Sequence, residues 1–383
     1  MITLSSEMEK FQHWFIHDAL PLWASRAYDD ARGGFYEALN FDATPSVNRP
    51  RRVRVQARQI HTFTQTGIRG WHKESETIAA KGFDYFLDVA CPDDGARGCV
   101  HIISDDGKII DDHRDLYDQA FLLLACASRW QAAQDRRAID LAEKTIKFLD
   151  AELASPHGGW LESDQNEVPR RQNPHMHLLE AFMALYRATD DKKYLERASD
   201  IVQLFLRVFY DEGAGILIEY FNDDFSPDEK RHIIEPGHMF ECVWLLKNYE
   251  HLSGTDYSDV RDSLYMRGTQ LGEDPQFFGF VSNKVDMATP NLRAAKRLWP
   301  QTEYLKASLI EARNGNDKAK ILTTSLIENL FATYLHVAKA GLWVDEFDAL
   351  GTSTAKDVPA SILYHLFEAV VETYPTANSR NGE

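Results

Sequence analysis

The sequence predicts an all-α fold, an (α/α)6 barrel in which six helical hairpins close into two concentric rings. Helical periodicity dominates the chain of 383 residues, a glycine followed by a short extended segment recurs between alternate helices, and these recurrences are almost equally spaced. A single helical hairpin cannot bury its apolar face alone, so neighbouring hairpins stack. A closed ring of them leaves no exposed end.

About twelve amphipathic stretches produce the helical periodicity, with apolar residues recurring every three or four positions. Two helices in each of six units account for this number. The expected helices cover residues 7–28, 53–67, 76–89, 115–132, 137–154, 176–189, 193–209, 238–252, 257–271, 292–312, 321–338 and 359–373.

Six glycines mark the recurring extended segment, and apolar or aromatic residues follow each of them. Their spacings along the chain are 65, 60, 57, 64 and 62 residues. We expect short β-hairpin-like loops at these points, with the aromatic residues lining a central cleft. The alternative is an open helical solenoid in which some of the glycines are ordinary turn markers. The six glycines are Gly33, Gly98, Gly158, Gly215, Gly279 and Gly341.

We expect one catalytic domain over residues 1–375, because no linker rich in Pro, Gly or Ser divides the helical pattern. The small polar residues 376–383 are expected to form a flexible C-terminal tail. The N-terminus lacks the basic start and apolar run of a signal peptide, and no apolar stretch approaches the roughly 20 residues that cross a bilayer. The sequence therefore predicts a soluble, cytoplasmic protein.

The formal net charge of −17 disfavours nucleic acid and acidic membrane surfaces as partners, because like charges repel at long range. Small neutral molecules are better candidates. The four cysteines contain no Cys-x-x-Cys pair, which argues against a structural zinc site and fits reduced thiols in the cytosol. They are Cys91, Cys99, Cys126 and Cys242.

Polar residues interrupt the apolar pattern near the start of several helices. In the segment 173–181, Asn173, His177 and Glu180 project in succession around the first turn. A helix cap beside a hydrogen-bonded core histidine is the alternative. His175 and His177 also resemble a metal-binding pair, but no third ligand at a characteristic spacing supports that interpretation.

Two further helices carry polar residues on apolar faces. His238 and Glu241 share one face, and a carboxylate beside a histidine fixes its tautomer and raises its basicity. Burying such a pair is costly unless it has a partner or a function. Trp299 and Glu303 are four residues apart and combine an aromatic platform with a carboxylate, which suits sugar binding. A core tryptophan and a surface glutamate are the alternative.

Arg58 and His365 complete the candidates. Arg58 shares a helix face with His61, although an arginine in this position is by itself more often a surface or salt-bridged residue. His365 lies in the last, strongly apolar helix, where a single histidine is more often a hydrogen-bonded core residue. Together, however, these groups recur near the N-terminal parts of different inner helices. Such convergence of titratable groups is typical of a catalytic cleft.

At these residues the sequence resembles the N-acylglucosamine 2-epimerase superfamily, which includes mannose isomerases, aldose–ketose isomerases of sulfoquinovose metabolism and cellobiose 2-epimerases. Residues 173–181 resemble its Asn-x-x-Met-His-x-x-Glu-Ala segment, and residues 237–246 resemble Gly-His-x-x-Glu-x-x-Trp-Leu-Leu. Residues 298–303 resemble Trp-Trp-x-Gln-x-Glu, with Leu298 in place of the first Trp. The match runs in order from Arg58 to His365 and so covers nearly the whole chain.

The resemblance implies an (α/α)6 barrel in which His238 and His365 are the acid/base pair and Arg58 and His177 assist at the substrate oxygens. Some relatives have Gln four residues before the last histidine, where this chain has Ser361, and this difference affects sugar preference. We expect no metal or other cofactor, a monosaccharide substrate, and a monomer or homodimer. The resemblance also implies a cleft lined by Tyr117, Asn173, Glu180, Glu241, Trp299 and Glu303.

The expected reaction is isomerisation of D-mannose to D-fructose by a 1,2-proton shift through a cis-enediol. Histidine, with a pKa near 6.5, both accepts and donates protons near neutral pH. A sugar 2-epimerase acting on N-acylglucosamine or on glucose and mannose is an open alternative, because it shares the enediol intermediate. A glycoside hydrolase would need two carboxylates, for which Glu180, Glu241 and Glu303 are candidates, but it leaves the histidines unexplained. A non-catalytic carbohydrate-binding scaffold is the last alternative.

Overall fold

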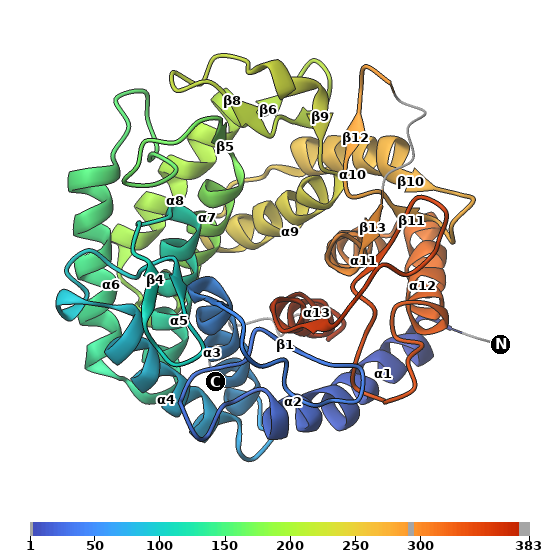
Figure 1. Ribbon diagram of the computed structural model, residues 1–383. Helices are drawn as coiled ribbons and strands as arrows, with labels where there is room; N and C mark the ends of the chain where they lie inside the picture. Colours follow the sequence, from blue (N-terminus) through green and yellow to red (C-terminus); the bar gives the residue numbers. More distant parts are fainter. Residues whose placement is uncertain (1–2, 290–294, 375–383) are drawn as a thin grey trace, which may run out of the picture.

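The computed structural model describes residues 3–289 and 295–374, and its regular structure is mostly helical (Figure 1). Six helices form an inner ring: α3 (Val53–Ile68), α5 (Leu116–Ala133), α7 (Asn173–Thr189), α9 (Pro236–Ser253), α11 (Leu298–Arg313) and α13 (Ser361–Glu372). The outer ring contains α1 (Leu4–Trp14), η1 (Phe15–Ala19), α2 (Leu20–Arg26), α4 (Ser75–Tyr85), η2 (Phe86–Ala90), α6 (Arg136–Phe148), η4 (Leu149–Leu153), α8 (Lys192–Leu204), η5 (Phe205–Phe209), α10 (Ser258–Gly272) and α12 (Asp317–Ala332). In the outer ring, the label η marks short π-helical segments that continue an α-helix. Two further η elements, η3 (Asp93–Gly95) and η6 (Glu229–His232), are 3-10 turns in the loops.

The inner ring is closed. Each inner helix packs against the next, and α13 packs against α3. The amide Nε2 of Gln59 in α3 donates to the backbone carbonyl of Ala360 at 2.7 Å across this closing contact. The closed ring confirms the predicted barrel over the open solenoid.

A layer of short strands follows the same ring at one end of the barrel. Antiparallel pairs join neighbouring repeat units, and the last unit pairs with the first. An isolated bridge between Asp115 and Ser163 joins the second unit to the third. The pairs between units are β2 (Arg51–Arg52) with β3 (Ile102–Ile103), β5 (Arg170–Arg171) with β8 (Tyr220–Phe221), β9 (Ile233–Ile234) with β12 (Val285–Asp286), β13 (Lys296–Arg297) with β14 (Glu346–Phe347), and β15 (Val358–Pro359) with β1 (Ala38–Leu39). Pairs within a unit are β3 with β4 (Ile109–Asp111), β6 (Tyr210–Asp211) with β7 (Ile216–Leu217), and β10 (Glu273–Asp274) with β11 (Phe280–Val281).

The recurring glycines fit the conformation expected of them, because all six have a positive φ. At Gly341, φ is +88°, and a Cβ would lie 2.5 Å from the carbonyl oxygen of Asp18. A residue with a side chain would therefore be strained in conformation and would also clash with the backbone. The glycine spacing in the sequence thus reports a repeated backbone requirement.

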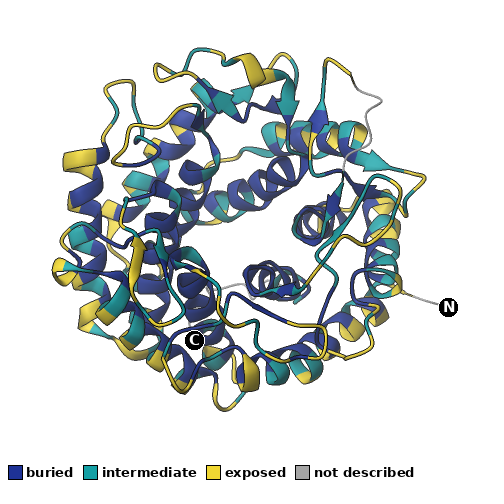
Figure 2. Cartoon of the chain, in the orientation of Figure 1, coloured by how far each residue is buried: buried dark blue, intermediate teal, exposed yellow. Residues whose placement is uncertain are grey.

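Burial separates the two rings, as Figure 2 shows. Inner helices are buried on nearly all sides, whereas exposed residues gather on the outer helices and loops. In α13 every residue from Ser361 to Val370 is buried. A polar side chain on an inner helix must therefore find a partner or face a cavity.

The two largest differences between predicted and observed helices lie in α11 and α12. The helix expected over 292–312 begins at Leu298, because Lys296 and Arg297 form β13, and residues 292–294 lie outside the described part. The helix expected over 321–338 spans 317–332, since the side chain of Asn316 caps its N-terminus. The predicted tail 376–383 also lies outside the described residues. Among the residues described, none of the helices combines the length and hydrophobicity that a membrane crossing requires.

Candidate active site

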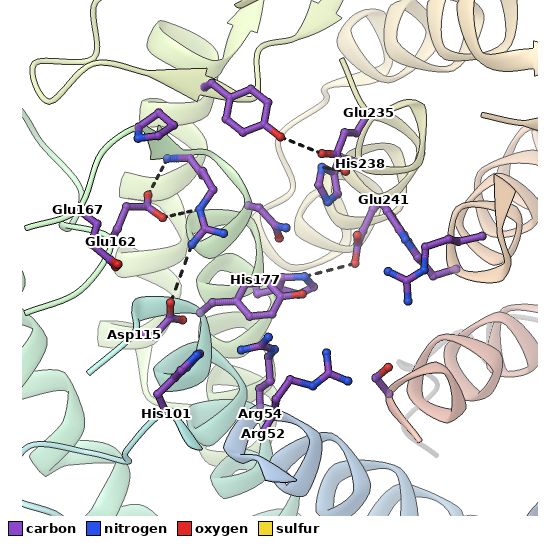
Figure 3. Close-up of a pocket in the computed structure, with 18 of the residues that line it drawn as sticks. Arg52, Arg54, His101, Asp115, Glu162, Glu167, His177, Glu235, His238 and Glu241 are labelled. Carbon is purple, nitrogen blue, oxygen red and sulfur yellow. Dashed lines mark hydrogen bonds and ion pairs between the residues drawn. The ribbon is translucent and has the colours of Figure 1, made fainter. Parts of the chain in front are cut away.

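A cavity of about 820 Å³ lies at the strand-bearing end of the barrel, where the N-terminal parts of the inner helices converge (Figure 3). The inner helices begin at the same end of the barrel, and polar residues of their first turns face its central axis. These residues therefore meet around one cavity. Eight of the predicted residues line the cavity: Arg58, Tyr117, Asn173, His177, His238, Glu241, Trp299 and His365.

His238 lies in the first turn of α9 and is buried. Its Nδ1 is 3.0 Å from Oε2 of Glu219 and 3.7 Å from Oε2 of Glu235. Burial alone lowers the pKa of His238, but the negative charges of Glu219 and Glu235 outweigh it and raise the pKa to about 9. The imidazole is therefore cationic at neutral pH and can donate a proton.

His365 has the opposite electrostatic environment. Its Nδ1 is 2.9 Å from Oε1 of Glu303, whose other oxygen is 2.6 Å from Nζ of Lys306. Burial lowers the pKa of His365 well below 6.5, and the positive charges of Arg58 and Lys306 act in the same direction. The ring is therefore neutral at neutral pH. Environments that push two pKa values apart distinguish an acid from a base.

Both histidines flank one aromatic ring. The centroid of Trp299 is 5.0 Å from that of His238 and 5.8 Å from that of His365. Because all three side chains line the same cavity, both imidazoles can reach one bound monosaccharide.

Arg58 is a buried cation on α3. Its Nη2 donates to the hydroxyl of Tyr117 at 2.7 Å, and its guanidinium lies over the rings of Phe121 and Tyr364 at 4.1 and 5.1 Å. Among the described residues it makes no ion pair, and its Nε has no hydrogen-bond partner. An uncompensated guanidinium at the wall of a cavity suits a ligand with partial negative charge.

His177 lies between two carboxyl groups. Its Nδ1 is 3.1 Å from Oε2 of Glu180, and its Nε2 is 3.9 Å from Oε1 of Glu241 (Figure 3). Burial lowers the pKa of His177 well below 6.5. Burial also raises the pKa of Glu180 to about 7, and burial together with the charge of Glu303 raises that of Glu241 to about 8. Both carboxyl groups are therefore partly protonated near neutral pH.

Two residues expected to line the cleft lie behind it instead. Glu180 is one helical turn further along α7 than His177, accepts a hydrogen bond from Tyr364, and lines a second cavity of about 600 Å³ nearer the C-terminal ends of the inner helices. Glu303 is fully buried against His365. These two carboxyl groups position the histidines rather than contact the cavity.

Glu219 does not follow from the pattern along helix faces, because it precedes His238 by 19 residues and lies in a loop after β7. A signal for it exists in the repeat. The extended segment ends in a glutamate at Glu37, Glu162 and Glu219, and the first two accept backbone N–H groups of Arg52 and Arg171.

In the described part of the chain, two groups of three side chains have the spacing of a metal site. They are Glu241, Glu303 and His365, and, at the edge of the cavity, His101, His113 and Asp115. In the first group, Glu303 is already paired with Lys306, whose Nζ lies 2.6 Å away. The positive charge of Lys306 would repel a metal ion bound there. His175 does not pair with His177, because its Nε2 accepts the backbone N–H of Trp160 at 3.0 Å, away from the cavity.

Comparison with known proteins relates the whole chain to sugar isomerases and epimerases. The family model described as N-acylglucosamine 2-epimerase (GlcNAc 2-epimerase) matches residues 34–369. A mannose-6-phosphate isomerase of Rhizobium meliloti (strain 1021) is 34% identical over 94% of each chain. The structure of cellobiose 2-epimerase from Bacillus thermoamylovorans B4167 superposes with a TM-score of 0.86 at 19% identity, covering 96% of this chain and 98% of that one. A crystal structure of D-mannose isomerase gives a TM-score of 0.82 at 20% identity, covering 97% and 96%.

Proposed function

The chain belongs to the N-acylglucosamine 2-epimerase family and is a sugar isomerase or epimerase, and within this class we propose that it interconverts D-mannose and D-fructose. One observation carries the proposal: a cationic His238 and a neutral His365 line the same cavity, on either side of Trp299. The reaction needs one group that donates a proton to the sugar and one that removes a proton from it, and these two imidazoles can fill the two roles.

The first step opens the sugar ring. The cationic His238 donates a proton to the ring oxygen, and the neutral imidazole that results takes the proton of the anomeric hydroxyl as the aldehyde forms. Glu219 stabilises the imidazolium before transfer through the 3.0 Å contact with Nδ1. His238 thereby acts first as a general acid and then as a general base, and it is cationic again when the step ends.

The second step moves a proton between adjacent carbons. The Nδ1–H of His365 donates to Glu303, so its Nε2 is the free base that takes the proton from C2 and returns it to C1. Between these events the intermediate is a cis-enediolate with negative charge on its oxygens, and a proton passes from O2 to O1 before C1 is protonated. Arg58 and His177 stabilise that charge, and such stabilisation is often a large part of catalysis.

The charges around the cavity favour a neutral sugar. Four of its guanidinium groups are already paired with carboxylates, and Arg58 is assigned to the enediol. Little positive charge remains for a phosphate dianion. The pairs are Arg52 with Glu37, Arg54 with Asp118, Arg171 with Glu162, and Arg297 with Asp345.

A phosphorylated hexose is the second candidate. The Rhizobium meliloti relative is named for mannose 6-phosphate, and Lys230 at the cavity makes no ion pair among the described residues. A lysine at the edge of the cavity could hold a phosphate group without entering the acid/base chemistry.

The deciding experiment offers the protein D-mannose, D-mannose 6-phosphate and N-acetylglucosamine in deuterated water and follows the products by NMR. We expect D-fructose that carries solvent deuterium, and a higher kcat/KM for D-mannose than for its 6-phosphate. A preference of tenfold or more for the phosphate would replace D-mannose by the second candidate. Glucose as the main product from D-mannose, or N-acetylmannosamine from N-acetylglucosamine, would identify an epimerase instead.

A further inference from the structure

Two imidazoles and a carboxylate meet at one side of the cavity, apart from the acid/base pair. They are His101, His113 and Asp115, here called the rim cluster, and one ligand atom of each lies within 4.8 Å of the others. His101 precedes β3, His113 follows β4, and Asp115 is the N-cap of α5, so a hairpin and a helix start bring them together. The two imidazole centroids are 4.2 Å apart. Figure 3 shows His101 and Asp115 on the same wall of the cavity.

Each imidazole of the rim cluster has a carboxylate behind it. Nδ1 of His101 is 2.5 Å from Oδ2 of Asp118, and Nδ1 of His113 is 2.8 Å from Oδ1 of Asp111. These contacts place the proton on Nδ1 and leave Nε2 of each ring free to coordinate. The same carboxylate–histidine arrangement occurs behind most metal-ligating histidines, where it fixes the ring and raises its basicity.

The residues around the rim cluster carry a net negative charge, which favours binding of a dication. Asp111, Asp115 and Asp118 contribute three negative charges, and Arg54, 3.2 Å from Asp118, offsets one of them. Arg171 is 3.9 Å from Asp115, but its charge is already paired with that of Glu162, whose carboxylate is nearer, at 2.7 Å. With neutral imidazoles the local charge is therefore about −2.

We propose that the rim cluster binds one divalent transition-metal ion, such as Zn²⁺ or Co²⁺, through Nε2 of both histidines and a carboxylate oxygen of Asp115. Two imidazoles and one carboxylate are an established donor set for such ions. Metal–ligand bonds of about 2.1 Å hold ligand atoms no more than about 4.2 Å apart, so small side-chain movements complete the site. The remaining coordination positions face the cavity, where water or a hydroxyl group of a bound sugar can occupy them.

The test uses the full-length protein, stripped with a chelator, dialysed, and titrated with Zn²⁺ by calorimetry and with Co²⁺ by visible absorption. We expect about one equivalent to bind, and His101→Ala and His113→Ala each to weaken binding at least tenfold. Asp118→Asn keeps all three ligands but removes the carboxylate behind one of them, and is expected to weaken binding by about 10- to 100-fold. The control is His232→Ala, because this half-exposed imidazole also has a carboxylate nearby, Asp286 at 3.7 Å, yet belongs to no three-ligand group among the described residues.

Three results would overturn the proposal. The first is no binding by the stripped wild-type protein, and the second is equal weakening in the rim variants and the control. The third concerns location and needs no variant. Anomalous diffraction at the zinc edge should show a peak between His101 and His113, and a peak at Glu241, Glu303 and His365 instead would exclude the rim cluster. All readouts are of binding, so they stand whatever sugar the protein converts.

Discussion

His238 and Glu219 form a buried contact of 3.0 Å between Nδ1 and Oε2, although Glu219 belongs to a loop and His238 to an inner helix. The contact sets the charge of the proposed acid, because Glu219 contributes most among the groups that raise the pKa of His238 to about 9. The pKa of His365, in contrast, lies well below 6.5, because burial and nearby positive charges disfavour its cationic form. The division of roles between the two histidines therefore depends on their partners.

Glu219→Gln is expected to lower the pKa of His238 by about 1 to 3 units, since it removes a nearby negative charge. The cationic form of His238 is active and exists below its pKa, so a lower pKa moves the alkaline limb of kcat/KM to lower pH. A pH–rate profile and a nitrogen-15 NMR titration of the imidazole check this. Glu229→Gln, which changes an exposed carboxylate, is the control, and identical profiles for both variants would contradict the assignment.

His365→Asn is expected to reduce turnover by about 10²- to 10⁴-fold, because it removes the base that carries the proton between C2 and C1. Incorporation of solvent deuterium into the sugar should fall by the same factor, because the label enters only through this proton transfer. His336→Asn, on an exposed histidine, should leave both rates unchanged. Deuterium incorporation at the wild-type rate in His365→Asn would exclude His365 as the base.

Lys306→Met tests the buried pair behind His365. Lys306 and Glu303 are fully buried with a 2.6 Å contact, so removing the cation leaves an uncompensated buried carboxylate and should lower the free energy of unfolding by about 3–5 kcal/mol. Lys320→Met breaks an exposed pair of the same i,i+3 spacing, with Asp317 at 2.9 Å, and should lower the free energy of unfolding far less, because solvent screens the two charges. Urea unfolding of both variants measures the difference. Equal losses would show that burial of the inner pair has no energetic weight.

Gly341→Ala tests the repeated glycine. Gly341 and Gly315 have similar positive φ values, +88° and +93°, but only Gly341 would place a Cβ against backbone, at 2.5 Å from an oxygen of Asp18. Gly315→Ala should cost about 1–3 kcal/mol from conformational strain alone. Gly341→Ala should cost more, because backbone must also move, and thermal unfolding compares the two. A smaller loss at Gly341 would contradict the close packing there.

The barrel could be predicted from sequence because each repeat unit makes the same backbone demand. The six spaced glycines, such as Gly33 and Gly341, all require a positive φ, and this requirement is visible without any knowledge of contacts. Helix boundaries were less predictable where a strand or a cap intervened, as at Lys296 and Asn316. Those features depend on pairing with distant or neighbouring residues rather than on hydrophobic period.

The sequence predicts which residues of the inner helices face the cavity, but not which carboxylates contact them. Residues of the first turns, such as His238 and Trp299, line the cavity as expected. The carboxylate partners did not follow from spacing along one helix. Glu241 shares a helix face with His238, yet Nδ1 of His238 contacts Glu219, and His365 pairs with Glu303 from another helix. Such partners depend on which helices the ring brings together, and this is a property of the folded chain.

The closing contact between α13 and α3 has a consequence for biosynthesis. Because α13 both completes the inner ring and carries His365, a nascent chain that ends before it has an open core and no base. A premature stop before α13 thus releases a product whose unsealed ring presents apolar surface to chaperones and proteases, and which lacks the proposed base His365. The inner ring can therefore close only after α13 has been synthesised.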